Sequence, residues 1–177
     1  MSASHPLGRA DLFAFLDKLG IKTTTLEHVA VFTVQESKAL KRDIAGGHSK
    51  NLFLKDKKDN IFLVVAEHDA AIDLKTIHEK IGAQGRVTFA KPELMFELLG
   101  VTPGSVTPLG LINDPKSRIK VVLDAPMMMH EMLNYHPLEN TATTSIAAQD
   151  LLTFIRATGH EPHVIAISHG KLDLEQD

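Results

Sequence analysis

Apolar residues recur at helical spacing in three stretches of the chain, and a glycine follows each stretch. Glycine readily adopts the left-handed conformation that commonly ends a helix, and Pro92 suits the first turn of the second stretch. The pattern therefore predicts three helices with defined ends. They span residues 9–19, 92–99 and 147–157, and they are followed by Gly20, Gly100 and Gly159.

Helix starts are also marked by side chains that can accept hydrogen bonds from the free amides of a first turn. Thr33 and Glu36 form a capping-box pattern, which predicts a helix that runs to about Ile44. Asp73 is predicted to cap a helix over residues 74–81, which Gly82 would end. Ser145 is predicted to cap the helix over residues 147–157.

Short apolar or alternating runs predict the strands. The runs at residues 52–54 and 61–65 are separated by the polar sequence Asp56–Asn60 and therefore predict a hairpin. The loop at residues 101–108 contains two prolines and a glycine, so we expect it to be irregular. Further strands are predicted at residues 21–27, 86–90, 118–124 and 163–168. Strands joined partly by a hairpin and partly through helices predict a mixed sheet with helices around it, in the α+β class.

Length and composition limit the organisation of the chain. Its 177 residues, 44% of them hydrophobic, suit one domain, which we expect over residues 1–168, followed by a polar tail at residues 169–177. The absence of cysteine excludes disulfides, thiolate zinc sites and a cysteine nucleophile. No apolar run approaches the roughly 18 residues of a membrane span, and a signal peptide pattern is absent, so we expect a cytoplasmic protein without membrane contact.

The charge is unevenly distributed. The net charge of -3 argues against coating of nucleic acid, but residues 38–58 carry a local charge of +5, which leaves -8 for the remainder. This segment can meet phosphate, or it can simply be well solvated. Its cations are Lys38, Lys41, Arg42, Lys50, Lys55, Lys57 and Lys58.

Lys50 is the first candidate for a functional residue. It follows Gly46 and Gly47 and precedes the apolar strand at residues 52–54. Glycines let the backbone approach a ligand closely, so this lysine can hold an ammonium at a fixed place beside a cleft. The alternative is an ordinary solvated lysine at a strand end.

Other kinds of site have little support. The pairs His130 with His136 and His160 with His163 lack the helical spacing of the zinc-protease motif, so we expect no metal, and no cofactor motif of the Rossmann or P-loop type is present. Ser105 lacks the context of a catalytic serine. The three methionines at residues 127–129 are interpreted as core packing.

Four segments together resemble a known family, the YbaK/ProRS-associated aminoacyl-tRNA editing domains, and within it the freestanding alanyl-tRNA(Pro) deacylases of the ProXp-ala or PrdX type. The resemblance covers about residues 9–168 and implies a single domain with a largely antiparallel, barrel-like sheet surrounded by helices. The segments are Val31-Phe-Thr-Val34, Gly47-His-Ser-Lys50-Asn51-Leu-Phe-Leu-Lys-Asp56, Gly100-Val-Thr-Pro-Gly104-Ser-Val-Thr-Pro108 and His136-Pro-Leu-Glu-Asn140-Thr-Ala-Thr143.

The resemblance implies an enzyme that hydrolyses the ester of alanyl-tRNA(Pro) after the synthetase has released it. Its shared lysine falls on Lys50, and its G-x-x-x-P loop, whose amides would stabilise a developing oxyanion, falls on residues 104–108. His136 would orient the substrate or the water, although it could equally bond its own turn. The expected catalytic residues are Lys50, Gly104, Ser105, Val106, Pro108 and His136. The expected substrate contacts are Asn51, Phe32, Val34 and Asn140, and the expected tRNA contacts are Lys38, Lys41, Arg42, Lys55, Lys57 and Lys58.

Two alternatives remain open at this point. One is a deacylase of the same fold that acts on cysteinyl-, seryl- or threonyl-tRNA. The other is a module that binds the tRNA acceptor end without catalysis, although the intact Lys50 and the loop at residues 104–108 weigh against it. The expected partners are the acceptor end of mischarged tRNA(Pro) and, transiently, prolyl-tRNA synthetase or an elongation factor.

Overall fold

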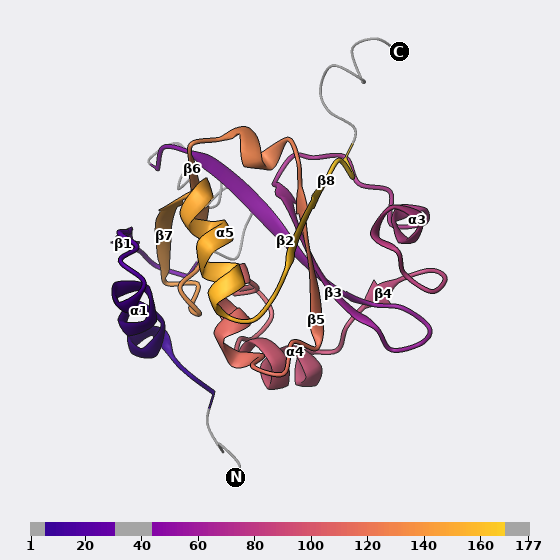
Figure 1. Cartoon of the computed structure of the whole chain (residues 1–177), viewed down its shortest axis with the longest axis horizontal. Coiled ribbons are helices and arrows are strands. Elements are labelled where there is room, and N and C mark those ends of the chain that lie inside the picture. The colour runs from indigo at the N-terminus through magenta and orange to yellow at the C-terminus, as the bar shows by residue number, and fades with distance from the viewer. Residues whose placement is uncertain (1–5, 31–43, 169–177) are drawn as a thin grey trace.

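Strands and helices alternate along the part of the chain that the computed structural model describes, residues 6–30 and 44–168 (Figure 1). The helices are α1 Arg9–Lys18, α3 Ile77–Ile81, α4 Pro92–Leu99 and α5 Ala148–Ala157, with 3-10 turns η1 Pro108–Asn113 and η2 Met127–Met129. The strands are β1 Thr24–Glu27, β2 Gly47–Lys55, β3 Ile61–Glu67, β4 Thr88–Phe89, β5 Ile119–Asp124, β6 Met132–Tyr135, β7 Ala142–Ala147 and β8 Pro162–Ile165.

All of these strands belong to one mixed sheet. The order along it is β1-β7-β6-β2-β3-β5-β8, and β4 pairs with β2 at the side. The pairs β1–β7, β6–β7, β2–β3 and β2–β4 are antiparallel, whereas β2–β6, β3–β5 and β5–β8 are parallel. The predicted α+β fold with a largely antiparallel mixed sheet and surrounding helices is therefore confirmed.

Two hydrophobic cores lie on opposite faces of this sheet. The larger contains Phe53 and Leu63 from the strands together with Leu151 and Phe154 of α5, and it also takes in residues of α1 and α4. The smaller covers the other face with Leu54, Phe62 and the α3 residues Ile77 and Ile81. Figure 1 shows α1 and α3 at opposite sides of the molecule, with α5 in front of the sheet. The strand β3 is buried on both faces, as its continuous apolar run requires.

The predicted helix ends are confirmed where the signal is local. Gly20, Gly82 and Gly100 have φ values of 74°, 75° and 69°, the left-handed conformation that stops a helix. Pro92 occupies the first turn of α4. Because each of these signals acts within one turn of backbone, tertiary contacts are not needed to specify it.

The predicted hairpin is also confirmed. β2 and β3 pair in register from Ser49 opposite Glu67 to Lys55 opposite Ile61. The turn is stabilised by Asp56, whose carboxylate accepts hydrogen bonds from the amides of Lys58, Asn60 and Gln84. Burial raises the pKa of Asp56, but these hydrogen bonds favour the charged carboxylate and lower the pKa below its ordinary value overall.

Several predictions about the remaining elements were wrong. Ser145 lies inside β7 and does not cap a helix, and α5 begins after Ala147 without a side-chain cap. The strands β6 and β7 were not predicted, and α3 begins at Ile77 rather than at residue 74. The predicted helix at residues 33–44 falls largely, and the tail at residues 169–177 entirely, outside the described residues.

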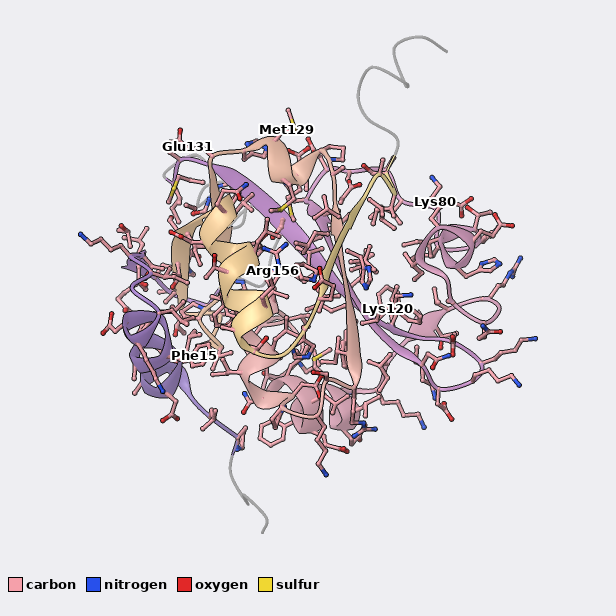
Figure 2. All side chains as sticks on the ribbon, viewed as in Figure 1. Phe15, Lys80, Lys120, Met129, Glu131 and Arg156 are labelled. Carbon is pink, nitrogen blue, oxygen red and sulfur yellow. The ribbon has the colours of Figure 1, made fainter. Side chains whose placement is uncertain are left out.

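The methionines at residues 127–129 do not all pack in the core. Met127 is fully buried and contacts the hydroxyl of Tyr135, whereas Met129 is 86% exposed and points outward in Figure 2. The interpretation of the triplet as core packing is therefore wrong for Met129, because the 3-10 turn places successive side chains on different sides. Within the described residues, no helix is both long and apolar enough to cross a membrane.

Candidate active site

The parallel pairing of β2 with β6 lays the strand that carries Lys50 beside the strand that leads to His136. Gly47 pairs with Leu133, and His48 pairs with Asn134. Lys50 lies two residues further along β2, whereas His136 lies in the turn that follows β6. Side chains alternate along a strand, so the side chain of Lys50 lies on the same face of β2 as that of His48.

The glycine pair before Lys50 allows the chain to approach itself. At Gly46, where φ is 103°, an added Cβ would lie 2.9 Å from the carbonyl oxygen of Met132. At Gly47 an added Cβ would lie 2.6 Å from the imidazole ring of His130. Contacts this short do not occur, so the glycines are required for the pairing of β2 with β6. Their close approach to β6 is thus explained by the pairing, and their predicted approach to a ligand stays a prediction.

Lys50 is half-buried and held in place. Its Nζ donates a hydrogen bond to the carbonyl oxygen of Ala70 at 2.6 Å. Ala70 belongs to the turn after β3, where its amide donates to the carbonyl oxygen of Glu67 at 3.0 Å. An ammonium carries three donors, so this contact positions the charge and leaves donors for a substrate.

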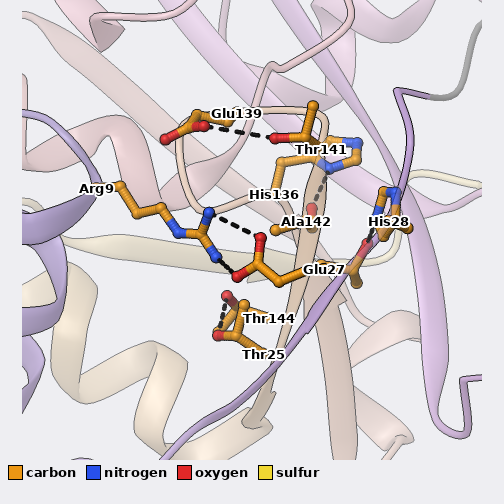
Figure 3. A network of polar contacts seen from close by, with 10 residues as sticks. Arg9, Thr25, Glu27, His28, His136, Glu139, Thr141, Ala142 and Thr144 are labelled. Carbon is orange, nitrogen blue, oxygen red and sulfur yellow. Dashed lines mark hydrogen bonds and ion pairs between the residues drawn. The ribbon is translucent and has the colours of Figure 1, made fainter.

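His136 is half-buried at the base of the turn that follows β6. Its Nδ1 bonds the carbonyl oxygen of Ala142 at 3.0 Å and must carry the proton, because a carbonyl oxygen only accepts. Burial lowers the pKa of His136, the bond to Ala142 opposes this, and the positive form of nearby His28 lowers the pKa further. Figure 3 shows His136 and His28 close together. At neutral pH, Nε2 of His136 is therefore free of a proton and can accept a hydrogen bond. The predicted hydrogen bond of His136 to its own turn is also present, through Nδ1 and the carbonyl oxygen of Ala142.

The loop at residues 104–108 meets the same turn. Gly104 has φ of 96°, and a Cβ there would lie 3.6 Å from the side-chain nitrogen of Asn140, so glycine is required by its backbone angle and not by lack of space. The Ser105 amide donates to the carbonyl oxygen of Thr102 at 3.0 Å. Among the described residues, no acceptor is seen for the amides of Gly104, Val106 and Thr107. Thr107 is fully buried, so the amides of Gly104 and Val106 are the ones that remain available to an oxyanion.

Two further parts of this loop serve its own structure. Thr107 caps η1 by accepting a hydrogen bond from the Leu109 amide, and Pro108 is buried in the first turn of η1. Val106 is half-buried against the larger core. Within the described part of the chain, no hydrogen bond joins this loop to Lys50.

The structure separates Asn51 from Lys50. Successive side chains point to opposite faces of a strand, and Asn51 therefore lies on the side of Phe53 and the larger core. Its Oδ1 is buried without a hydrogen-bond partner among the described residues. A substrate that contacts both Lys50 and Asn51 would have to approach β2 from two sides.

The predicted tRNA contacts lie at two places. Lys55, Lys57 and Lys58 are at the closed end of the hairpin, where Lys55 pairs with Asp59 at 3.4 Å. The five residues from Lys50 to Lys55 span about 17 Å of strand. The predicted residues that lie outside the described part of the chain are Phe32, Val34, Lys38, Lys41 and Arg42.

A cavity of about 550 Å³ lies at the β1 and β7 side of the sheet, and its lining includes neither Lys50 nor His136. Among the wall residues, Thr143 and Ser145 were not predicted as site residues. The alternation of small hydroxyl residues in Thr-Ala-Thr-Thr-Ser, residues 141–145, would have indicated a strand with one polar face. The cavity is lined by Thr24, Leu26, Ile44, Ala45, Gly46, His130, Glu131, Met132, Thr143 and Ser145.

The histidine pairs do not form a metal site in the described structure. His160 is buried and bonds a carboxylate oxygen of Asp114 at 2.8 Å, whereas His130 pairs with Glu67 near the cavity. Within residues 6–30 and 44–168, no group of three or more potential metal ligands is found.

Comparison with known proteins assigns the family. The sequence model described as "Aminoacyl-tRNA editing domain" matches residues 28–154. The chain is 40% identical over 161 residues to the mouse "Prolyl-tRNA synthetase associated domain-containing protein 1", covering 89% of this chain and 95% of the relative. It is 35% identical over 150 residues to the "Prolyl-tRNA editing protein ProX" of Acetoanaerobium sticklandii, covering 84% of this chain and 91% of that protein.

Solved structures agree on the fold. A crystal structure provisionally assigned as a trans-editing enzyme for prolyl tRNA synthetase superposes with a TM-score of 0.69 at 22% identity, covering 92% of this chain and 98% of the other. The structure of the hypothetical protein APE2540 also gives a TM-score of 0.69, at 21% identity, over 89% of this chain and 99% of the other. By sequence similarity over most of its length, this chain belongs to the aminoacyl-tRNA editing domain family.

Proposed function

We propose that this protein hydrolyses the ester bond of mischarged alanyl-tRNA(Pro) in trans, with residues 1–168 as the editing domain and the cytoplasm as its place of action. The observation that carries the proposal is the pairing of β2, which carries Lys50, with β6, which leads to His136, in a sheet whose β7 side borders a cavity of about 550 Å³. Relatives named for prolyl-tRNA editing and for association with prolyl-tRNA synthetase support tRNA(Pro) as the substrate class.

Alanine is the expected amino acid because of its size. A synthetic site for proline also accepts the smaller alanine, since each missing methylene costs only about 1 to 3 kcal/mol of discrimination. A second site that excludes proline corrects this error. A freestanding editing domain acts after the mischarged tRNA has left the synthetase, so contact with the synthetase or an elongation factor would be transient.

The reaction needs no covalent intermediate on the protein. Water attacks the carbonyl carbon of the ester, and the negative charge that develops on the carbonyl oxygen is stabilised by donors that are already in place. The unpaired amides of Gly104 and Val106 are suited to this role. Lys50, held by the carbonyl oxygen of Ala70, supplies a fixed positive charge to the terminal phosphate or the carbonyl side of the substrate. Nε2 of His136 can accept a proton or a hydrogen bond from a ribose hydroxyl or the attacking water.

Binding of the acceptor stem is assigned to the cations at the closed end of the hairpin. The ammonium groups of Lys55, Lys57 and Lys58 can reach phosphates that lie away from the reacting ester, while Lys50 lies about 17 Å further along β2. Lys38, Lys41 and Arg42, which belong to the same cationic segment of the sequence, are proposed as further contacts to the tRNA.

The proposal is tested by the rates at which the purified protein hydrolyses alanyl-, cysteinyl-, seryl-, threonyl- and prolyl-tRNA(Pro). We expect rapid loss of alanine and little loss of proline. Preferential hydrolysis of the cysteinyl, seryl or threonyl ester would assign a different substrate on the same fold. Binding of tRNA without hydrolysis of any ester would identify a binding module and overturn the assignment as an enzyme.

A further inference from the structure

Two hydroxyl side chains of β7 form one wall of the cavity. Thr143 and Ser145 are two residues apart on the same strand, so they lie on the same face of the sheet, and both line the cavity. A hydroxyl has one proton to donate and two lone pairs that accept. The direction in which each proton points therefore decides what the wall can bind.

The proton of Thr143 points away from the cavity, toward His28. Nδ1 of His28 bonds the carbonyl oxygen of Val29 at 2.7 Å and must be protonated, because that oxygen cannot donate. In the neutral imidazole, Nε2 is then an acceptor. It lies 2.8 Å from Oγ1 of Thr143, so the hydroxyl donates to His28. The oxygen of Thr143 is left with lone pairs only.

The proton of Ser145 is also committed. The side-chain nitrogen of Asn134 donates to the carbonyl oxygens of Ala45 and Gly47, both at 3.1 Å, which fixes the orientation of this amide. The amide oxygen of Asn134 therefore faces Ser145, whose hydroxyl donates to it. Asn134 is only 4% exposed, so solvent does not compete for these bonds. Like Thr143, Ser145 offers the cavity an acceptor and no donor.

A wall of acceptors without donors selects its ligand by charge and hydrogen-bonding type. It favours a group rich in N–H donors, and it disfavours carbonyl or phosphate oxygens, which would meet lone pairs. The carboxylate of Glu131, also at the cavity, adds negative charge (Figure 2). Lys50, on β2 and separated from β7 by β6, has the opposite preference, because its ammonium attracts oxygen atoms and repels cations.

We propose that Thr143 and Ser145 bind the α-ammonium of the aminoacyl ester, so that they orient the substrate with its amine toward β7 and its carbonyl toward Lys50. This inference rests on the proposed deacylation, and Thr143 and Ser145 are positioning residues in it, with His28 and Asn134 acting through them. The exocyclic amine of the terminal adenine is a second N–H donor group that could bind the same two hydroxyl oxygens. The experiment below distinguishes these two N–H donors.

The test compares alanyl-tRNA(Pro) with propionyl-tRNA(Pro), which has the same carbon chain without the ammonium. Thr143→Val removes only the hydroxyl and preserves the shape of the side chain. Loss of a hydrogen bond to a charged group corresponds to roughly 10- to 100-fold in kcat/KM for the alanyl ester. We expect the propionyl ester to change by less than about 2-fold, and Thr143→Ser to restore the alanyl rate. Each variant is compared with the wild type on the same ester, so the different intrinsic reactivities of the two esters cancel.

Thr25→Val is the matched control. Thr25 is bonded to Thr144, the core-facing neighbour of Thr143, so this variant makes the same chemical change on the opposite face of the same pair of strands (Figure 3). It should leave both esters unaffected. If Thr143→Val lowers the melting temperature strongly, Ser145→Ala carries the same comparison.

The outcomes separate this inference from the proposed function. Equal losses for both esters would assign the wall to the adenine amine and overturn the ammonium assignment, and so would unchanged rates for both. A wild-type protein that hydrolyses no aminoacyl ester would overturn the proposed function itself.

Discussion

The ammonium of Lys50 donates a hydrogen bond to the carbonyl oxygen of Ala70 at 2.6 Å, which joins the middle of β2 to the turn after β3. Among the described residues, Lys50 belongs to neither hydrophobic core, and this hydrogen bond holds its ammonium in place. This arrangement suits a side chain that supplies charge at a defined position and contributes little to packing.

We therefore expect Lys50→Ala to abolish deacylation, to below roughly 1% of the wild-type rate, while the fold remains intact. Single-turnover hydrolysis of alanyl-tRNA(Pro) and thermal unfolding measure the two effects. The control is Lys18→Ala, which removes an exposed lysine of α1. A Lys50 variant with normal melting and a near-normal rate would show that this lysine is not part of the site.

Replacement of Gly104 tests the loop. At φ of 96°, alanine is strained by about 1–2 kcal/mol, and relief of that strain would turn the amides of residue 104 and Val106 away from the substrate. We expect Gly104→Ala to lower the deacylation rate by about 100-fold. Gly20→Ala is the matched control, because Gly20 has φ of 74° and open space around it. Both variants should lose similar stability, and an equal loss of rate in both would contradict a special role for the loop.

The lysines of the hairpin turn predict a salt dependence. If Lys55, Lys57 and Lys58 contact phosphates, the logarithm of the tRNA association constant should fall linearly with the logarithm of salt concentration. We expect a slope of about -0.7 to -0.9 per contact, and no steeper than about -4 in total for an acidic protein. Changing all three lysines to glutamate should weaken binding and flatten the slope, whereas Lys116→Glu should not. Binding that is insensitive to salt would place the interface elsewhere.

Asp114 predicts a loss of stability in acid. It is 1% exposed; burial raises its pKa, but hydrogen bonds from His160 and from the amides of Ile119 and Arg118 outweigh this and lower the pKa below its ordinary value. A carboxylate with a lowered pKa stabilises the fold above its unfolded pKa of about 3.9, and this contribution is lost as pH falls through the lower folded value.

The wild-type protein should therefore lose free energy of unfolding below about pH 4. Asp114→Asn should be destabilised by about 3 kcal/mol at pH 7 and should lose less on acidification. Urea unfolding between pH 7 and pH 2.5 measures both, with Asp17→Asn, an exposed aspartate of α1, as the control. If the free energy of unfolding fell by the same amount on acidification in the wild type and in Asp114→Asn, ionisation of Asp114 would not be the source of the loss of stability in acid.

The size of the editing pocket can be tested at Val106. Exclusion of proline requires a rigid apolar wall, since every contact that alanine makes is also available to proline. We expect Val106→Ala to raise the rates on 2-aminobutyryl- and prolyl-tRNA(Pro) several-fold relative to alanyl-tRNA(Pro). Corresponding variants of the other predicted wall residues, Phe32 and Val34, should act similarly, and Val164→Ala on the exposed side of β8 should not.

Unchanged ratios in all three wall variants would indicate that the wall lies elsewhere or that proline is rejected through its secondary amine. Hydrolysis of N-methylalanyl-tRNA(Pro) by the wild type decides between these. A slow rate on that ester, combined with a fast rate on the 2-aminobutyryl ester, would assign the selectivity to the amine.

Local signals in the sequence determined the ends of α1 and α4 and the turn between β2 and β3. Gly20, Gly100 and Pro92 act through their own backbone angles, and Asp56 accepts hydrogen bonds from the amides of Lys58 and Asn60, which are two and four residues away. These interactions are nearly the same in any fold, so they could be predicted without knowing it. The family resemblance extended the prediction to the fold class and to the importance of Lys50.

The tertiary structure decided everything that depends on pairing between distant segments. The strands β6 and β7 are short and polar on one face, and they exist because β6 pairs with Gly47 and β7 with β1; without those partners, Ser145 resembled a helix cap. The same pairings bring the strand of Lys50 beside β6 and place the hydroxyls of Thr143 and Ser145 against His28 and Asn134. A hydroxyl proton points to the strongest nearby acceptor. For Thr143 that acceptor is His28, 115 residues away in the sequence, and for Ser145 it is Asn134, 11 residues away.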